Sequence, residues 1–263
     1  MPDAPTLYTE FHDGNGPHLL LVHGIISGRS HWMRNLTGLK EFTRPIVVEL
    51  LGHGRSPSPE MIETYHPDWY AAEFERIRAF VGAERWYVCG QSLGASLTLR
   101  YSLKHPQRIA AQAFTNSASA FATREWTEEN RQRMEAELAR MSPTDRSRID
   151  GSPVNPANNT RLPDEVRAAL RADMALHNPL GIARTGLGTS PYTSVRDVVT
   201  DITVPTLMVV GRFEKAFEEN RKYAEQTIPN LETVEADAGH GVNLDDPEGF
   251  NNALRGFFAK HPI

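Results

Sequence analysis

The chain has 263 residues, of which 40% are hydrophobic and 23% charged, and its formal net charge is −5. These values suit a globular chain with one large domain, or with one domain that carries an insertion. A chain of this length buries a large core without needing disulfide bonds or other cross-links. They argue against a nucleic-acid-binding protein, which would carry a basic patch. The single cysteine, Cys89, excludes an internal disulfide and a cysteine-rich metal site.

The N-terminal segment MPDAPTLYTE has neither a basic start nor an apolar run, so it does not predict a secretory signal. No stretch approaches the ~20 apolar residues that cross a membrane. Together with the lone cysteine, this predicts a cytoplasmic protein without a membrane partner. The sequence specifies no oligomeric state.

Short apolar segments alternate with helical patterns along the chain. Buried strands are predicted, in chain order, at His18–Val22, Pro45–Leu50, Trp86–Gln91, Ala111–Thr115, Thr206–Val210 and Leu231–Ala236. Helices are predicted at Asp68–Val81, Leu93–Leu103 and Pro247–Ala259. This alternation predicts an α/β fold, with a mainly parallel sheet and helices on both faces.

The alternation stops between residues 121 and 201, where no strand pattern is found. Helical runs at Thr123–Met141 and Pro163–Leu176 flank a loop with the sequence SPVNPANNT, and the later segment GIARTGLGTS is rich in glycine and predicts a loop. We therefore predict a helical insertion at 121–201 in a core formed by 1–120 and 202–263. The charges of the first helix are typical of a solvated face.

Residues 90–94, Gly-Gln-Ser-Leu-Gly, match the pattern G-x-S-x-G between a predicted strand and a predicted helix. On such a sharp turn the serine side chain projects forward, and glycine is needed two residues before and after it because neighbouring chains pass close. Ser92 is therefore the predicted nucleophile. A serine that merely caps the helix is the alternative, and the motifs that follow make it less favourable.

The segment His23-Gly24-Ile25 follows the first predicted strand. Acyl transfer creates a negatively charged oxygen, which backbone N–H groups must already face. The N–H groups of Ile25 and Leu93 are the candidates for this oxyanion hole. His23 is either a catalytic base or a buried residue that fixes the loop.

His240 lies in Ala-Gly-His-Gly, after the last predicted strand and therefore at the edge where α/β enzymes place their chemistry. Its imidazole can take the serine proton and return it to a leaving group. The acid that orients it is predicted to be Glu214, which follows the strand Thr206–Val210. Other acids are less well placed, either before the strand, on the next helix or too near His240: Asp197, Asp201, Glu218, Glu219, Asp237, Asp245 and Asp246.

Taken together, these motifs resemble the α/β-hydrolase family over nearly the whole chain. The resemblance rests on HG-x, GHGRS, GQSLG, VPTLMVVGRFE and AGHGVNLDDPEGF, and on the order nucleophile, acid, histidine. It implies an eight-stranded, mostly parallel sheet and a helical cap that begins near Phe121. It also makes His240 the base and His23 a loop-fixing residue, and it implies no metal or organic cofactor.

The chain departs from the family pattern at several positions. Glu214 stands where aspartate is usual, and the uncharged Asn116 occupies the other place where members carry the acid. Ser92 argues against dehalogenases and epoxide hydrolases, which use aspartate. Leu93 replaces the tryptophan of proline iminopeptidases, Ala95-Ser96 lacks the arginine of menaquinone-precursor enzymes, and Gly241 replaces the aromatic residue of carbon–carbon hydrolases. By elimination, these differences favour an esterase or lactonase.

The predicted function is hydrolysis of a carboxylic ester or lactone of a small, largely apolar substrate through an acyl-enzyme. Three apolar residues are candidates for the substrate pocket, namely Trp32, Met33 and Trp126, although core packing explains each of them equally well. The same triad would also serve a carbon–carbon hydrolase, a thioesterase or an acyltransferase. A ligand-binding receptor on the same fold is the alternative from a different class.

Overall fold

In the computed structural model, which describes residues 6–263, the chain folds around one seven-stranded sheet. Residues 1–5, the start of the segment that predicts no secretory signal, lie outside the described residues. The strands are β1 (Thr9–Phe11), β2 (His18–Val22), β3 (Arg44–Val48), β4 (Trp86–Gly90), β5 (Ile109–Thr115), β6 (Thr206–Gly211) and β7 (Leu231–Ala236). Their spatial order is β1-β3-β2-β4-β5-β6-β7, and the only antiparallel pair is β1 with β3.

The six predicted strands are confirmed as β2 to β7, with ends that differ by at most two residues. β1 was not predicted, because three residues are too few to show an alternating pattern. The expected eight strands are wrong for the described residues, which form seven. Only a turn containing Gly14 and Gly16 joins β1 to β2, and Gly16 has a φ of +126°, so this connection leaves no room for another strand.

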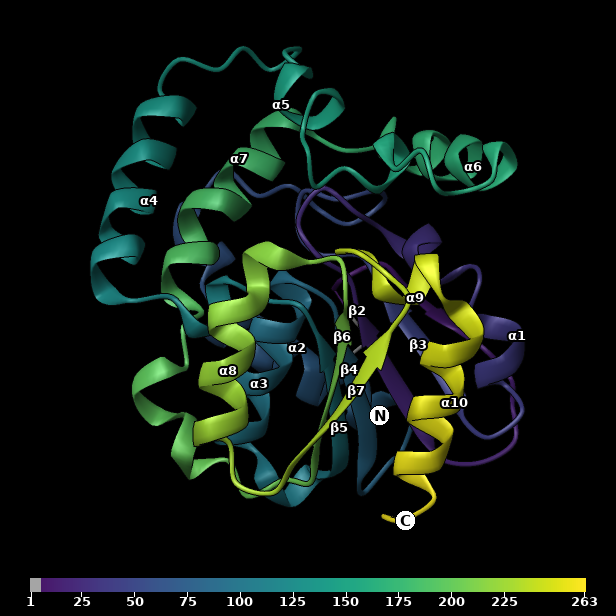
Figure 1. The fold of residues 1–263 in the computed structure, drawn as a ribbon. Helices are drawn as coiled ribbons and strands as arrows, with labels where there is room; N and C mark the ends of the chain where they lie inside the picture. Colours follow the sequence, from purple (N-terminus) through teal and green to yellow (C-terminus); the bar gives the residue numbers. More distant parts are fainter. Residues whose placement is uncertain (1–5) are drawn as a thin grey trace.

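Helices cover both faces of the sheet (Figure 1). One face carries α1 (Leu36–Leu39) and α10 (Pro247–Phe258), and the other carries α2 (Pro67–Phe80), α3 (Leu93–Lys104) and α8 (Glu218–Thr227). The strands supply apolar side chains to both faces, as parallel strands must. In β2, for example, Leu19 and Leu21 pack on the α10 side, and Leu20 and Val22 pack on the opposite side.

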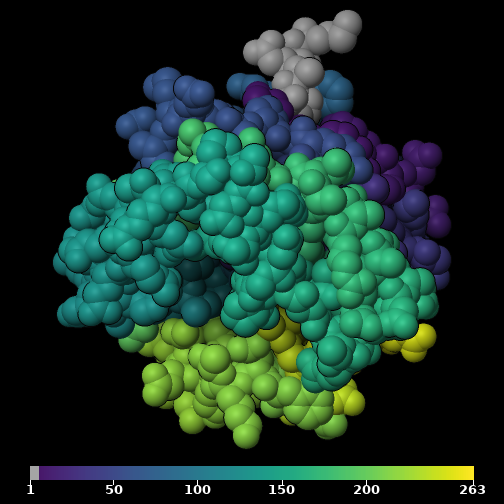
Figure 2. Space-filling view, turned by 90° about the horizontal axis from the view of Figure 1, so that it is seen from above, coloured from purple at the N-terminus to yellow at the C-terminus, as the bar shows by residue number. Residues whose placement is uncertain are grey.

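The segment between β5 and β6 forms a helical layer over the carboxyl ends of the parallel strands (Figure 1). Its α-helices are α4 (Arg124–Leu138), α5 (Ser147–Asp150), α6 (Asp164–Met174) and α7 (Pro179–Gly188). Figure 2 looks down on this layer and shows its teal and green atoms covering much of the face, with a hollow between them. Within residues 6–263, no helix combines the length and apolarity needed to cross a membrane.

The glycine-rich segment GIARTGLGTS was predicted to be a loop, and this prediction is wrong, because most of it forms α7. The Asn178 side chain caps the helix by accepting from Gly181 N at 2.8 Å, and Pro179 occupies the first turn. A Cβ added to Gly181 would lie 2.6 Å from Gly52 Cα. Glycine is present because the helix packs against backbone, so tertiary contact overrides its low helix propensity.

Candidate active site

Ser92 lies at the turn between β4 and α3, where the chain reverses within two residues. Its φ of +52° and ψ of −116° are unusual for a residue with a side chain, and such a conformation costs about 1–3 kcal/mol. The surrounding structure holds this turn: Gln91 N donates to Val22 O at 2.9 Å and Gly94 N donates to Gln91 O at 2.8 Å. The sequence prediction of a strained strand-to-helix turn is thus confirmed in its geometry.

The two glycines of this turn are required by close backbone contacts. A Cβ on Gly90 would lie 2.3 Å from Gly94 O, and one on Gly94 would lie 2.1 Å from Val22 O. Each contact involves backbone, which cannot move aside as a flexible side chain can. The steric reason for glycine at these two positions is therefore borne out by the geometry.

Gly94→Ala is expected to lower the free energy of unfolding by about 3 kcal/mol, because the new methyl group would push α3 away from β2. Gly256→Ala in α10 is the matched control, since a Cβ there meets nothing within 4 Å. That control is expected to raise stability by about 0.5–1 kcal/mol through helix propensity. Urea denaturation measures both, and equal stabilities of the two variants would contradict the close-packing argument.

The loop after β2 passes directly beside Ser92. A Cβ on Gly24 would lie 2.8 Å from Ser92 Cβ, which brings the next residue, Ile25, to the edge of the nucleophile. The backbone N–H groups of Ile25 and Leu93 donate to no other group among the described residues. Both predicted oxyanion donors therefore belong to the immediate surroundings of Ser92 and are free to donate.

His240 and Glu214 are brought together from the ends of two neighbouring strands. His240 follows β7 and Glu214 follows β6, and the distance from His240 Nδ1 to Glu214 Oε2 is 3.4 Å. The His240 side chain is 34% exposed and that of Glu214 19% exposed. An acid on Nδ1 leaves Nε2 to face a serine, which is the arrangement that a triad requires. Hydrogen bonds of catalytic groups are often this long in the absence of substrate.

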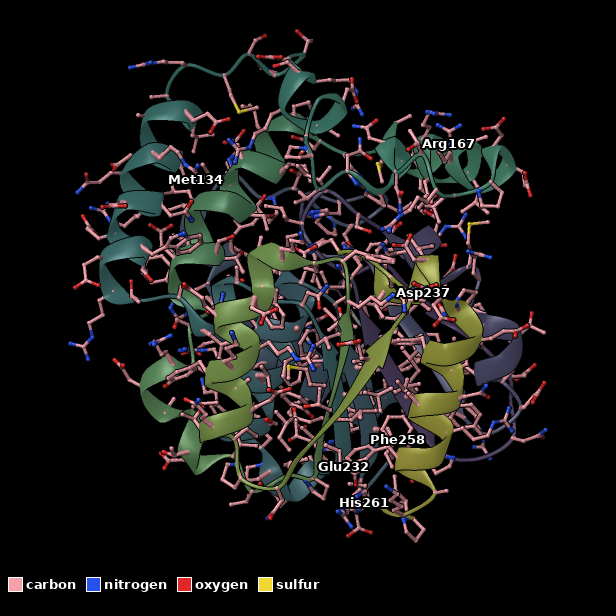
Figure 3. The ribbon with its side chains drawn as sticks, viewed as in Figure 1. Met134, Arg167, Glu232, Asp237, Phe258 and His261 are labelled. Carbon is pink, nitrogen blue, oxygen red and sulfur yellow. The ribbon has the colours of Figure 1, made fainter. Side chains whose placement is uncertain are left out.

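Most of the competing acids have other partners. Asp197 pairs with Arg124, Glu218 with Lys222, Asp237 with Arg212 and Asp245 with Arg161. Asp246 caps α10 by accepting from Gly249 N. Figure 3 shows Asp237 at the carboxyl end of β7, where the loop to His240 begins. The geometry therefore brings Glu214 to the histidine, while these other acids are engaged by other partners.

Three side chains hold the loop that carries His240. The Gln91 side chain donates to His240 O at 3.5 Å, and Asn116 Nδ2 donates to Gly239 O at 3.2 Å. Asp245 Oδ2 accepts from Gly239 N at 2.8 Å. These roles were not predictable from the sequence, because a contact from side chain to backbone leaves no sequence pattern.

Ser92 and His240 line one cavity of about 240 Å³. A cavity of this size suits a small-molecule substrate. Ser27, His31 and Gln91 line it from the core, and residues 153–161 supply its other side. The lining mixes apolar residues with many polar ones, and residues 153–161 contribute three asparagines and Arg161 to it.

The three residues predicted to shape the pocket are not brought into this cavity. Trp32 is fully buried in the core, with its ring centroid 6.1 Å from that of Phe250. Met33 is 39% exposed, and Trp126 lies on α4 beside a separate surface hollow. Within residues 6–263, no group of three or more His, Cys, Asp or Glu residues is arranged to hold a metal ion.

Three buried histidines fix the loops behind the site. His23 Nε2 accepts from Leu50 N at 3.0 Å, and His53 Nε2 accepts from Ile26 N at 3.2 Å. His177, from the helical layer, accepts from Gly54 N at 2.9 Å. His23 is thus the loop-fixing residue that the resemblance implied. Burial lowers the pKa of His23 to about 4 and that of His177 to about 3, so both rings stay neutral.

Acid is therefore expected to destabilise the fold through these histidines. Their folded-state pKa values lie below the value near 6.5 of the unfolded chain, so only the unfolded state gains protons as the pH falls below that value. Each such histidine is expected to remove about 1 kcal/mol of stability per pH unit between about pH 6 and pH 4.5.

His177→Asn tests this expectation, because the asparagine oxygen still accepts from Gly54 N but does not titrate. Denaturation at several pH values should show a slope that is shallower by about 1 kcal/mol per pH unit in the variant. An unchanged slope would contradict a proton-linked role for His177.

The fold and these motifs define a family. Residues 17–247 match the family model described as the alpha/beta hydrolase fold. The match covers most of the chain, and the chain therefore belongs to the α/β-hydrolase fold family.

Among known proteins, a pimeloyl-[acyl-carrier protein] methyl ester esterase of Aeromonas hydrophila is 25% identical over 93% of this chain and 96% of its own length. A putative 2-succinyl-6-hydroxy-2,4-cyclohexadiene-1-carboxylate synthase of Bacillus subtilis is 23% identical over 91% of this chain and 89% of its own. The solved structure of MenH from S. aureus superposes with a TM-score of 0.85 at 18% identity, covering 97% of this chain and 98% of that one. At 18% identity, this structural similarity shows a shared fold and nothing more.

Proposed function

We propose that this protein is a serine hydrolase that cleaves a carboxylic ester or lactone of a small molecule through an acyl-enzyme. The proposal rests above all on one observation: Ser92, on its strained turn, and His240, paired with Glu214, line the same cavity. The esterase name of the Aeromonas relative gives further support. The helical segment 121–201 would act as the cap, because its residues 153–161 close one side of the cavity.

In this mechanism Ser92 Oγ attacks the ester carbonyl carbon while its proton passes to His240 Nε2. The oxygen that becomes negative is held by the N–H groups of Ile25 and Leu93. His240 then gives the proton to the leaving alcohol as the carbon–oxygen bond breaks. A water molecule, deprotonated by the same histidine, attacks the acyl-enzyme and releases the acid and Ser92.

The synthase name of the Bacillus relative suggests a different reaction, but this chain lacks a residue expected for it. Menaquinone-precursor enzymes usually carry an arginine just after the serine turn. Here Ala95 and Ser96 occupy that place, and both are fully buried in α3. We therefore favour ester or lactone hydrolysis for this site.

The proposal is tested by incubating the protein with a fluorophosphonate and with a panel of p-nitrophenyl esters of short to long acyl chains. We expect a covalent adduct on Ser92, identified by mass spectrometry, and faster turnover of the short esters because the cavity is small. Labelling without ester turnover would redirect the search to thioesters, carbon–carbon bonds or acyl transfer. A chain that neither labels nor turns over any ester would be a binding protein.

A further inference from the structure

Two buried polar side chains of the cavity have hydrogen-bonding atoms that lack a well-placed partner among residues 6–263. Ser27 and His31 each have only 2% of their surface exposed, and both line the cavity that holds Ser92 and His240. Ser27 Oγ has no hydrogen-bond partner among the described residues, and neither ring nitrogen of His31 makes a hydrogen bond of normal geometry, although the Asn243 side chain lies near enough to act on the His31 pKa. A buried polar group without a hydrogen bond costs about 1–3 kcal/mol, so such atoms beside a reactive serine indicate a ligand.

The loop that carries these two residues is held rigidly in place. Ile26 N donates to His53 at 3.2 Å, and Ser30 N donates to Asp173 of α6 at 3.1 Å. Asn243 Nδ2 donates to His31 O at 2.7 Å. A binding group that is fixed before the ligand arrives loses little conformational entropy on binding. The loop is therefore preorganised to bind a ligand.

The chemistry of the two side chains selects a neutral polar group. Burial lowers the pKa of His31 to about 3, so the ring is neutral and offers one N–H donor and one acceptor. Ser27 likewise offers a hydroxyl that donates and accepts. Arg161, the arginine of the lining, is already paired with Asp245, since their charged groups lie 2.6 Å apart. A substrate carboxylate would find no unpaired charge here.

We propose that Ser27 and His31 form a specificity subsite that binds a neutral hydroxyl or carbonyl oxygen of the substrate. The substrates would then be small oxygenated esters or lactones, such as those of hydroxy acids or diols, rather than simple alkyl esters. This inference rests on the proposed function, because it deepens the assignment of the same cavity.

The test compares matched esters that differ by one hydroxyl group. Methyl 3-hydroxybutyrate is compared with methyl butyrate, and 3-hydroxypropyl acetate with propyl acetate. We expect at least one hydroxylated ester to have a kcat/KM about tenfold or more above its partner. Ser27→Ala and His31→Phe are expected to reduce this preference to about threefold or less, chiefly by lowering the kcat/KM of the hydroxylated ester.

Ser30→Ala is the matched control. Ser30 lies on the same loop and its buried Oγ also lacks a partner, but it does not line the cavity. It should therefore keep the wild-type preference. Thermal unfolding and fluorophosphonate labelling of every variant separate a folding defect from a loss of specificity.

A binding measurement tests the subsite independently of hydrolysis. Calorimetric titration of 3-hydroxybutyramide and butyramide should show tighter binding of the hydroxylated amide, and Ser27→Ala should remove the difference. Equal binding and equal turnover of the paired compounds would overturn the subsite, and so would a stronger preference for monomethyl succinate. Loss of labelling together with loss of all ester turnover would instead refute the serine hydrolase, with the titration still deciding the subsite.

Discussion

Ser92→Ala is expected to lower kcat for ester hydrolysis by about 10⁴–10⁶-fold, because it removes the atom that forms the acyl-enzyme. Stability should change little, since alanine takes the same φ of +52° with one atom fewer. Steady-state kinetics on a short p-nitrophenyl ester, together with thermal unfolding, measures both. The residual rate would come from the oxyanion donors and substrate binding alone.

Ser102→Ala is the control for this experiment. Ser102 lies on the same helix, α3, and is buried, but its Oγ donates to Leu99 O at 2.8 Å, away from the cavity. It should hydrolyse the ester at the wild-type rate within about twofold. A Ser92→Ala variant that kept more than about 1% of the wild-type kcat would show that another group is the nucleophile.

The parts of the site that depend on local geometry were predictable from the sequence. Ser92 and its two glycines form a pattern over five residues, and each glycine has a steric reason that adjacent backbone enforces. His240 and Glu214 were predicted from their places after two strands. Parallel strands bring all their carboxyl ends to one edge, so residues distant in the chain meet there.

The cavity walls were not predictable for a physical reason. Apolar side chains suit a core and a pocket equally, so nothing in the sequence distinguishes Trp32, which is core, from a residue that meets substrate. Residues 153–161 have no periodic pattern, and their position follows from contacts far along the chain. Arg161 pairs with Asp245 and Asn159 donates to the same carboxylate, which draws this loop over the site.

Helix α7 is a second feature that could not be predicted from the sequence. Glycine is a poor helix former in isolation, and a segment of this composition is typical of a loop. The helix forms because Gly181 and Gly188 pack against Gly52 and Tyr65, where a side chain would collide. The helix is therefore stabilised by the segments against which it packs. A single sequence does not reveal which segments those are.

Glu214→Gln is expected to lower kcat by about 10²–10⁴-fold while leaving KM within about threefold. The amide removes the negative charge that stabilises the protonated His240 during attack, and it can present the wrong group to Nδ1. Glu214→Asp keeps the charge but shortens the side chain by one methylene from a distance that is already 3.4 Å. Its kcat should therefore fall between those of the wild type and the glutamine variant.

Glu218→Gln separates a specific effect from a general loss of negative charge. Glu218 begins α8 only four residues later, and its exposed carboxylate pairs with Lys222 instead of the histidine. This variant should keep the wild-type kcat. If Glu214→Gln also kept it, no neighbouring acid could readily take over, because Asp237 and Asp245 are bound to arginines. The orientation of His240 would then depend on its loop alone, through the hydrogen bonds from Gln91 and Asn116.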